Sequence, residues 1–330
     1  MTRSRPIVLA AMLVMLAVAV AVGAASGSVA YSPATIVDTV LHPHASGQAS
    51  LVLWSLRFPR IAIAALVGGA LSVAGTLMQD LLGNPLVDPY LTGASAGAAF
   101  AIALAIAGGI PAAAYSAVAL GASLATTLLV AALSRTGTGL SVERMIVAGI
   151  ALSSLFAGLT TLVILWTPSS PVSLNILAWL GGSLAGHGWS DLRWAALYAA
   201  AGMVLALAAI PALNAMRLGV RRAQALGVDL DRTRWLVVIA TCLLTSAAVS
   251  VSGIIGFIGL IVPHIVRAAI GHDVRWNVVA AVPTGAAILI VADAVARSVA
   301  PPTELPLGIL LSLLGVPAFL YLATRRAKVA

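Results

Sequence analysis

Charged residues are scarce in this chain. Only 8% of its 330 residues are Asp, Glu, Lys or Arg, whereas about 25% is usual in a soluble domain. The hydrophobic share is 61%, so water is a poor solvent for most of the surface. A bilayer-spanning helix needs about 20 mostly apolar residues. The composition therefore argues against a soluble domain and indicates a multi-pass membrane protein.

Cysteine and lysine are almost absent. Cys242, the only cysteine, lies in an apolar run, which excludes an intrachain disulfide and predicts a packed core side chain. Lys328 is the only lysine, so no phosphate-binding loop ending in Gly-Lys-Ser/Thr exists. Zinc-ligand spacings and a nucleophile elbow are also missing. We expect no catalytic residue, metal site or cofactor here; any ATP, with its Mg²⁺, would be used by a separate chain.

Apolar runs between Gly, Pro and charged residues predict an all-α fold of about ten membrane-spanning helices. The predicted spans are 7–25, 60–82, 91–109, 113–133, 145–166, 194–213, 235–254, 258–270, 278–299 and 305–323. A shorter outer helix is predicted at about 172–186, and the eighth span is short. Ala24-Ala25-Ser26 resembles a cleavage site, so the first span has a second interpretation as a signal peptide. We favour an uncleaved span because the run is long enough to cross.

Basic residues are distributed unequally between the two sides of the membrane. With the N-terminus inside, fourteen fall on the cytoplasmic side and four on the outer side. Cytoplasmic loops of membrane proteins carry an excess of Lys and Arg. The distribution therefore predicts that both termini are cytoplasmic, which agrees with an even number of spans.

Two stretches, starting at Ser72 and Ser250, align without gaps and share, among other residues, Pro85 with Pro263. They begin in the second and seventh predicted spans, which lie five helices apart. An odd separation would invert one copy relative to the other across the membrane. The alignment predicts two inverted five-helix halves, although ordinary packing of small residues would also explain such matches.

The longest cytoplasmic loop, at about 214–234, has five arginines and two Leu-Gly pairs. Glycines can end short helices, and Leu218, Ala223 and Leu226 would give such a helix a small apolar face. Two interpretations remain open. The loop either only fixes the topology, or it forms a short helix that docks into the groove of a partner.

Three outer arginines, Arg57, Arg60 and Arg297, oppose the orientation rule. They either snorkel to the interface or pair with acidic groups of an external protein or an anionic ligand. Asp293 precedes Arg297 by four residues, so these two side chains are predicted to pair along one helix face.

Prolines end the second span near its inner end. Asn84-Pro85-Leu86 is followed closely by Asp88-Pro89, and two prolines four residues apart cannot continue a helix. The chain must turn there, so Asn84 and Leu86 could face the axis of an assembly. His264, after Pro263, is open to three interpretations: a packing residue, a proton carrier or a heme ligand.

Taken together, the motifs resemble the FecCD-type permease family, the membrane subunits of bacterial ATP-binding-cassette (ABC) importers for iron-siderophores, heme and vitamin B12. The matching motifs are LRFPR (56–60), GALSVAGTLMQDLLGNPLVDPYLTGASAGAAF (69–100), GIIGFIGLIVPHIVR (253–267), ADAVAR (292–297) and ELPLGILLSLLGVPAF (304–319). The resemblance covers nearly the whole chain. It implies one permease domain over 1–330, with the type II ABC importer fold, in the bacterial inner membrane.

The resemblance also implies partners and site residues. Two copies of the subunit would surround a pathway, with two cytoplasmic ABC ATPases inside and a periplasmic or lipid-anchored substrate-binding protein outside. The implied roles are binding-protein docking for Arg57, Arg60 and Arg297, ATPase coupling for Leu218, Gly219, Arg221, Arg222, Ala223, Leu226 and Gly227, and an inner gate at Asn84, Leu86, Val142 and Glu143.

The chain departs from the family pattern at two places. Val220 stands where the coupling segment often has an acidic residue, and the vitamin B12 permease has small hydroxyl residues at the positions of Val142 and Glu143. The gate residues and the cargo of family members are therefore transferred to this chain less directly than the fold is.

The function expected from the sequence is non-enzymatic transport. The chain would translocate an iron chelate by alternating access, with an iron-siderophore expected before heme and vitamin B12. The alternative is a proton-coupled secondary transporter, for which Asp293 and His264 are the candidate titratable groups.

Overall fold

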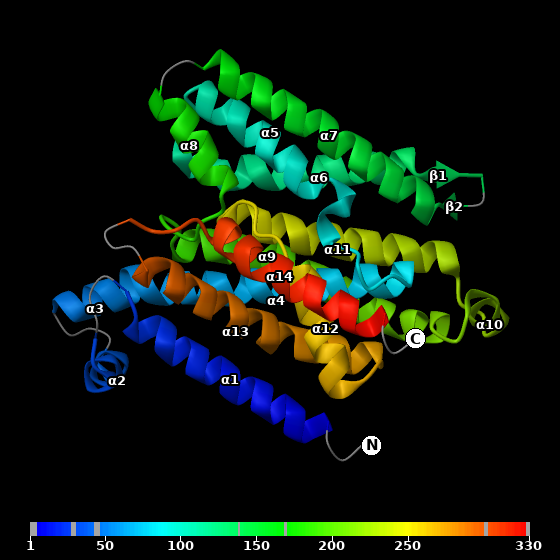
Figure 1. Cartoon of the computed structure of the whole chain (residues 1–330), viewed down its shortest axis with the longest axis horizontal. Helices are drawn as coiled ribbons and strands as arrows, with labels where there is room; N and C mark the ends of the chain where they lie inside the picture. The colour runs from blue at the N-terminus through cyan, green and yellow to red at the C-terminus, as the bar shows by residue number, and fades with distance from the viewer. Residues whose placement is uncertain are drawn as a thin grey trace.

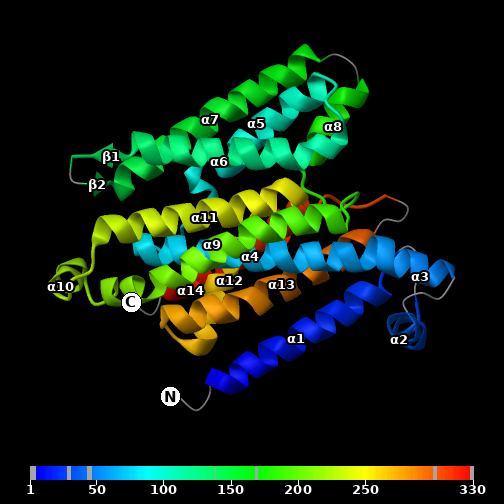
Figure 2. The same ribbon diagram turned by 180° about the vertical axis from the view of Figure 1, so that it is seen from behind.

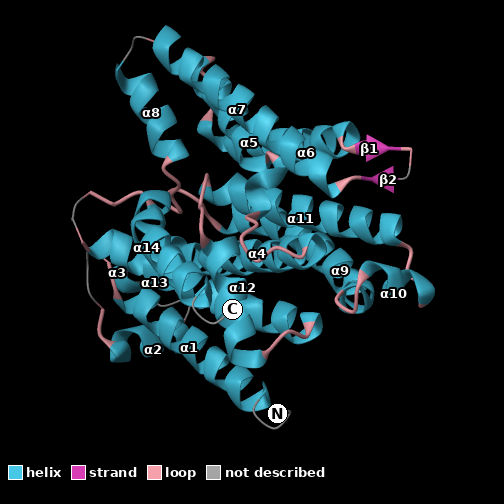
Figure 3. Cartoon of the chain, turned by 45° about the vertical axis from the view of Figure 1, so that its right-hand side comes forward, coloured by secondary structure: helices cyan, strands magenta, loops and turns pink. Residues whose placement is uncertain are grey.

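Helices form nearly all of the structure (Figure 1). The computed structural model describes residues 5–27, 31–42, 47–137, 139–167, 170–299 and 303–327, and Lys328 lies outside them. A backbone in lipid must satisfy its own hydrogen bonds, which a helix does locally. Within the described ranges, turns and loops join the helices, and the strands are limited to an antiparallel pair, β1 (Arg135–Thr136) and β2 (Gly139–Leu140), seen on the right in Figure 3.

Each predicted span coincides with a helix. These helices are α1 (Arg5–Ala25), α4 (Phe58–Leu82), α5 (Ala94–Ala107), α6 (Tyr115–Leu133), α7 (Val142–Trp166), α9 (Trp189–Met216), α11 (Leu230–Ser252), α12 (Ile258–Ile270), α13 (Val274–Ser298) and α14 (Leu307–Ala327). Seven helical segments of the described chain are long and apolar enough to cross a bilayer. Helices α5 and α12, with 14 and 13 residues, are too short for a full crossing. The length criterion thus supports fewer complete spans than the predicted ten.

Short helices account for the remaining differences. The predicted outer helix is α8 (Ser170–Leu180), which ends six residues earlier than expected. The helices α2 (Pro33–Leu41) and α3 (Gln48–Val52) and the π-helical turn Leu53–Arg57 were not predicted. They contain no long apolar run, so hydropathy alone does not detect them. Helix α2 lies beside the C-terminal end of α1 in both views (Figures 1 and 2).

Helix α4 occupies the centre of the bundle. It packs against α9, α11, α12 and α13, while α1 packs on α13 at the periphery of the bundle. Helices α5 to α8 form a separate layer that contacts the centre through α11 (Figures 1 and 2). Residues are buried on every side of α4, as expected for a helix that is apolar all round.

Glycines allow two very close helix contacts in this centre. A Cβ atom at Gly68 would overlap the backbone of Gly285 in α13, and one at Gly75 would overlap the backbone of Gly259 in α12. Small residues let membrane helices approach closely, where packing replaces the hydrophobic effect as the driving force. The contacts fix α4 against two neighbours at once.

The structure corrects the predicted sequence repeat. The first stretch continues α4 to Leu82, whereas the second contains the end of α11 and the break before α12. The reason is local: Gly253 adopts φ +64° and ends α11, while its aligned partner Gly75 lies inside a helix. The aligned residues are therefore not structurally equivalent, and the inverted halves stay a prediction.

Candidate functional site

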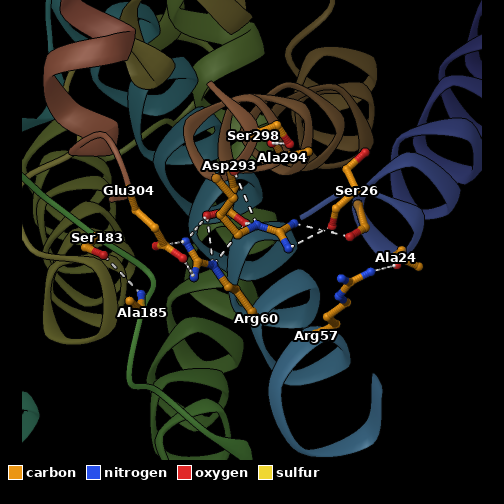
Figure 4. Close-up of polar contacts among 12 residues, drawn as sticks. Ala24, Ser26, Arg57, Arg60, Ser183, Ala185, Asp293, Ala294, Ser298 and Glu304 are labelled. Carbon is orange, nitrogen blue, oxygen red and sulfur yellow. Dashed lines mark hydrogen bonds and ion pairs between the residues drawn. The ribbon is translucent and has the colours of Figure 1, made fainter. Parts of the chain in front are cut away.

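The end of the bundle that the sequence predicts to face outward carries a compact arginine–carboxylate cluster (Figure 4). Arg60, in the first turn of α4, donates from Nε and Nη2 to Asp293 at 2.8–3.1 Å, and from Nη1 and Nη2 to Glu304 at 3.0 and 2.8 Å. Arg297 Nε lies 3.0 Å from Asp293 Oδ2, which confirms the predicted pair along α13. The cluster therefore ties α4 and α13 to the segment that precedes α14.

Arg57, which we count as the third arginine of the cluster, and Arg297 both bind the end of α1. Arg57 Nη1 donates to the carbonyl of Ala24 at 2.6 Å, and Arg297 donates to the carbonyls of Gly23 and Ser26 at 3.2 Å. The last carbonyls of a helix have no partner within it, and they favour a nearby cation. Both arginines are buried, so snorkelling to water is the wrong interpretation for them.

A cavity of about 480 Å³, lined by both apolar and charged side chains, lies over the cluster. Its walls include Leu56, the 184–188 loop, Arg57, Arg60 and Arg297. Burial lowers the pKa of His187 in that loop, against the opposing effect of the Asp191 carboxylate. Three arginines against two carboxylates leave the cluster with an excess of positive charge, which suits an acidic group entering from outside.

At the other end, the predicted coupling segment folds as a short helix, α10 (Val220–Ala225). Gly219 (φ +106°) and Gly227 (φ +82°) bound it. The N–H groups of Gly227 and Val228 donate back to Gln224 and Ala223 at 2.9 and 3.0 Å, a pattern that ends helices at a left-handed glycine. The expectation of a short helix between the two Leu-Gly pairs is confirmed.

The apolar face predicted for this helix needs a correction. Ala223 is fully buried within the chain, because its methyl points inward, and α10 contacts α9. Leu218 and Leu226 are 58% and 67% exposed, and Val220 is exposed beside them. Ala223 therefore anchors the helix, while Leu218, Val220 and Leu226 form an uncovered apolar surface. Arg221 and Arg222 are exposed on the same helix.

A charge network with a buried carboxylate at its centre lies next to this segment, and that centre was not identified from the sequence. Arg217, the residue at the end of α9, donates to Asp80 of α4 and to the carbonyl of His272. Arg267 of α12 donates to Gln79 and lies 3.9 Å from Asp80. Asp80 thus joins α4 and α12 to the residue before the coupling helix. The sequence did contain a sign of this network, because Asp80 is an ionisable residue within a predicted apolar span, and such residues usually have a functional or structural partner.

Replacing Asp80 with asparagine is expected to destabilise the protein by about 2 kcal/mol, because two arginines lose a buried counter-charge while the amide oxygen still accepts a hydrogen bond. Thermal unfolding in detergent measures the effect. Asp38→Asn is the matched control, since Asp38 is largely exposed and its ion-pair partner among the described residues is His42. Equal stability of the Asp80 and Asp38 variants would contradict a structural role for the buried pair.

The predicted inner-gate residues lie in two separate turns. Asn84 Oδ1 accepts from the N–H of Leu86 at 3.0 Å, and Leu86 is exposed. Val142 and Glu143 begin α7 after the 135–140 hairpin, and Glu143 is exposed. Among the described residues, no hydrogen bond or ion pair joins the two turns. Burial raises the pKa of nearby Asp88 to about 6.

Comparisons with known proteins cover almost the entire chain. A family model described as the FecCD transport family matches residues 12–325. The hemin transport system permease protein HmuU of Yersinia pestis is 37% identical, over 99% of this chain and 98% of its own length. The iron(3+)-hydroxamate import system permease protein FhuB of Bacillus subtilis is 35% identical, over 89% of this chain and 77% of its own length.

A solved structure of an inward-facing metal-chelate type ABC transporter superposes with a TM-score of 0.87. It is 29% identical, and the match covers 97% of this chain and 99% of that one. The fold and the sequence motifs therefore agree on the same class of protein.

Proposed function

Because the chain belongs to the FecCD transport family, we propose that it is the permease subunit through which an ABC importer moves an iron chelate across the bacterial inner membrane. Family membership makes it a multi-pass membrane permease of an ABC importer. The observation that carries the proposal is the match over residues 12–325, together with a hemin permease relative aligned along nearly its whole length.

An iron-siderophore is the first proposed cargo, and heme is the second. Relatives transport hemin, ferric hydroxamate, ferric citrate or vitamin B12, according to their names. Iron held in an organic chelate is common to the first three classes. The full-length similarity to the hemin permease supports including heme in every cargo test.

The assembly would use both ends of the bundle. Two copies of the subunit surround the pathway, with both termini in the cytoplasm, and two ATPases bind the apolar surface of Leu218, Val220 and Leu226. A substrate-binding protein docks over the outer cluster, where Arg57, Arg60 and Arg297 meet its acidic residues. Asn84, Leu86, Val142 and Glu143 are exposed or partly exposed, and we place them at the inner gate near the second copy.

Alternating access follows from this arrangement. Docking of the binding protein outside and closure of the ATPases inside would favour opposite states of the two gates. A proton-coupled mechanism has less support, because the buried carboxylate of Asp293 forms ion pairs with both Arg60 and Arg297, which compensate its negative charge.

Reconstitution in liposomes tests the function. The permease, its ATPase and its binding protein are expected to accumulate ⁵⁵Fe-hydroxamate or hemin only when ATP is hydrolysed, and cobalamin serves as the competing cargo. Uptake that is the same with ATP and with a non-hydrolysable analogue would refute the proposal. Uptake by the permease alone under a pH gradient would instead support proton coupling.

A further inference from the structure

The two carboxylates that bind Arg60 are held very differently. Asp293 is on α13, its side chain is 2% exposed, and Arg297 binds it as well. Glu304 is 38% exposed and lies in the non-helical 303–306 segment. Figure 4 shows them approaching the guanidinium of Arg60 from different elements. Arg60 therefore has one fixed partner and one partner at the surface.

The exposed partner is the one that another anion can replace. Water and salt screen the pair with Glu304, whereas the buried pair with Asp293 is screened much less. Displacing Asp293 would also leave Arg297 without its carboxylate partner. Two ion pairs, one with Arg60 and one with Arg297, therefore oppose the displacement of Asp293. Among the described residues, the hydrogen bonds and the ion pair of Glu304 are all made with Arg60, and Arg297 acts on Glu304 only through a longer-range charge interaction.

Glu304 also occupies the route by which a new carboxylate would reach Arg60. It lines the outer cavity together with Arg60 and the 184–188 loop. Its two oxygens accept from Nη1 and Nη2, the outer edge of the guanidinium, in the two-pronged geometry that any incoming carboxylate would prefer. An acidic side chain entering the cavity therefore competes with Glu304 for the same two nitrogens.

We propose that Glu304 is an internal substitute for a carboxylate of the docking protein. In the undocked permease Glu304 saturates the outer edge of Arg60; on docking, a glutamate or aspartate of the binding protein takes its place, and Asp293 remains bound. This inference rests on the proposed docking role of the outer arginines, and it adds a residue that weakens docking rather than supporting it.

The exchange leaves the start of α14 in place. The N–H groups of Leu307 and Gly308 donate to the carbonyls of Gly182 and Gly181, each at 2.9 Å. These bonds do not involve Glu304, so its side chain can leave Arg60 while the helix stays anchored. The movement needed is confined to one side chain and the 303–306 segment.

Glu304→Gln tests the exchange, since glutamine has the same shape without the charge. The affinity of the cognate substrate-binding protein for the detergent-purified permease should rise about fivefold at low ionic strength, because a competing anion is lost. The gain should shrink in 0.5 M NaCl. If Glu304 instead positions Arg60 for docking, the same change should weaken binding, which would overturn the proposal.

Two further variants separate the exchange from general charge effects. Asp191→Asn removes one negative charge beside His187 of the cavity wall, and no hydrogen bond or ion pair joins Asp191 to Arg60 among the described residues. This change should alter the affinity less than twofold. An equal gain in both variants would overturn the exchange. Glu304→Asp keeps the charge on a shorter side chain and should give an intermediate affinity.

The outcomes also distinguish this inference from the proposed function. Binding that is equally tight in parent and Glu304→Gln, with unchanged thermal stability, refutes the exchange and leaves docking intact. Absence of binding in both proteins refutes the docking role and, with it, the exchange.

Discussion

Replacing Leu226 with aspartate is expected to abolish ATP-driven uptake and to weaken ATPase binding by about 100-fold, or about 2.7 kcal/mol. The side chain is 67% exposed at the end of α10, so its own chain gives it little cover. In the complex an aspartate would place an unpaired charge in an apolar contact. The free permease should keep its stability, because surface changes away from buried features cost little.

Affinity of the purified permease for its ATPase, measured beside liposome uptake, checks this result. Leu226→Met keeps an apolar side chain of similar volume and should bind normally. Gln224→Asp adds the same charge to an exposed position of the same helix. If Gln224→Asp costs as much as Leu226→Asp, charge rather than apolar contact controls binding. Unchanged ATPase binding by Leu226→Asp would remove this surface from the coupling role.

Gly75→Ala is expected to have the largest effect on folding. A single methyl group there would overlap the backbone of Gly259, and a backbone atom cannot rotate away as a side chain can. Helices α4 and α12 would have to separate, which we expect to destabilise the protein by about 3 kcal/mol or more. The yield of monodisperse protein and its unfolding temperature in detergent measure the loss.

Gly121→Ala is the matched control. It adds the same methyl group inside α6, where no atom lies within 4 Å of the new position. Alanine is a better helix former than glycine, so this variant should gain up to about 1 kcal/mol. Opposite signs for the two substitutions would identify the close backbone contact as the cause. Equal effects would show that α4 and α12 can relax.

The helices were predictable because hydropathy is a local property. Each apolar run became a helix within a few residues of its predicted bounds, and the pair of Asp293 with Arg297 followed from a four-residue spacing. The short helix between Gly219 and Gly227 was predictable for the same reason, since glycine ends helices through its own backbone freedom.

The partners of Arg60 and Arg217 were not predictable in this way. Arg60 binds Glu304 across 244 positions, and Arg217 binds Asp80 across 137. Many carboxylates satisfy the charge requirement, and only the packing of the helices selects one. The sequence placed the outer arginines at one end of the bundle and predicted the pair of Asp293 with Arg297. It did not reveal Glu304 or the carbonyls at the end of α1 as further acceptors.

The binding of α1 by Arg57 and Arg297 has a consequence for biogenesis. The acceptors are the carbonyls of Gly23, Ala24 and Ser26, at the point where a signal peptidase would cut. Removal of the first helix would deprive two buried guanidinium groups of several hydrogen-bond acceptors, at a cost of about 1–3 kcal/mol for each group left unsatisfied. These contacts support the prediction that the first helix is kept as a membrane span, and a variant lacking α1 is expected to unfold at a lower temperature.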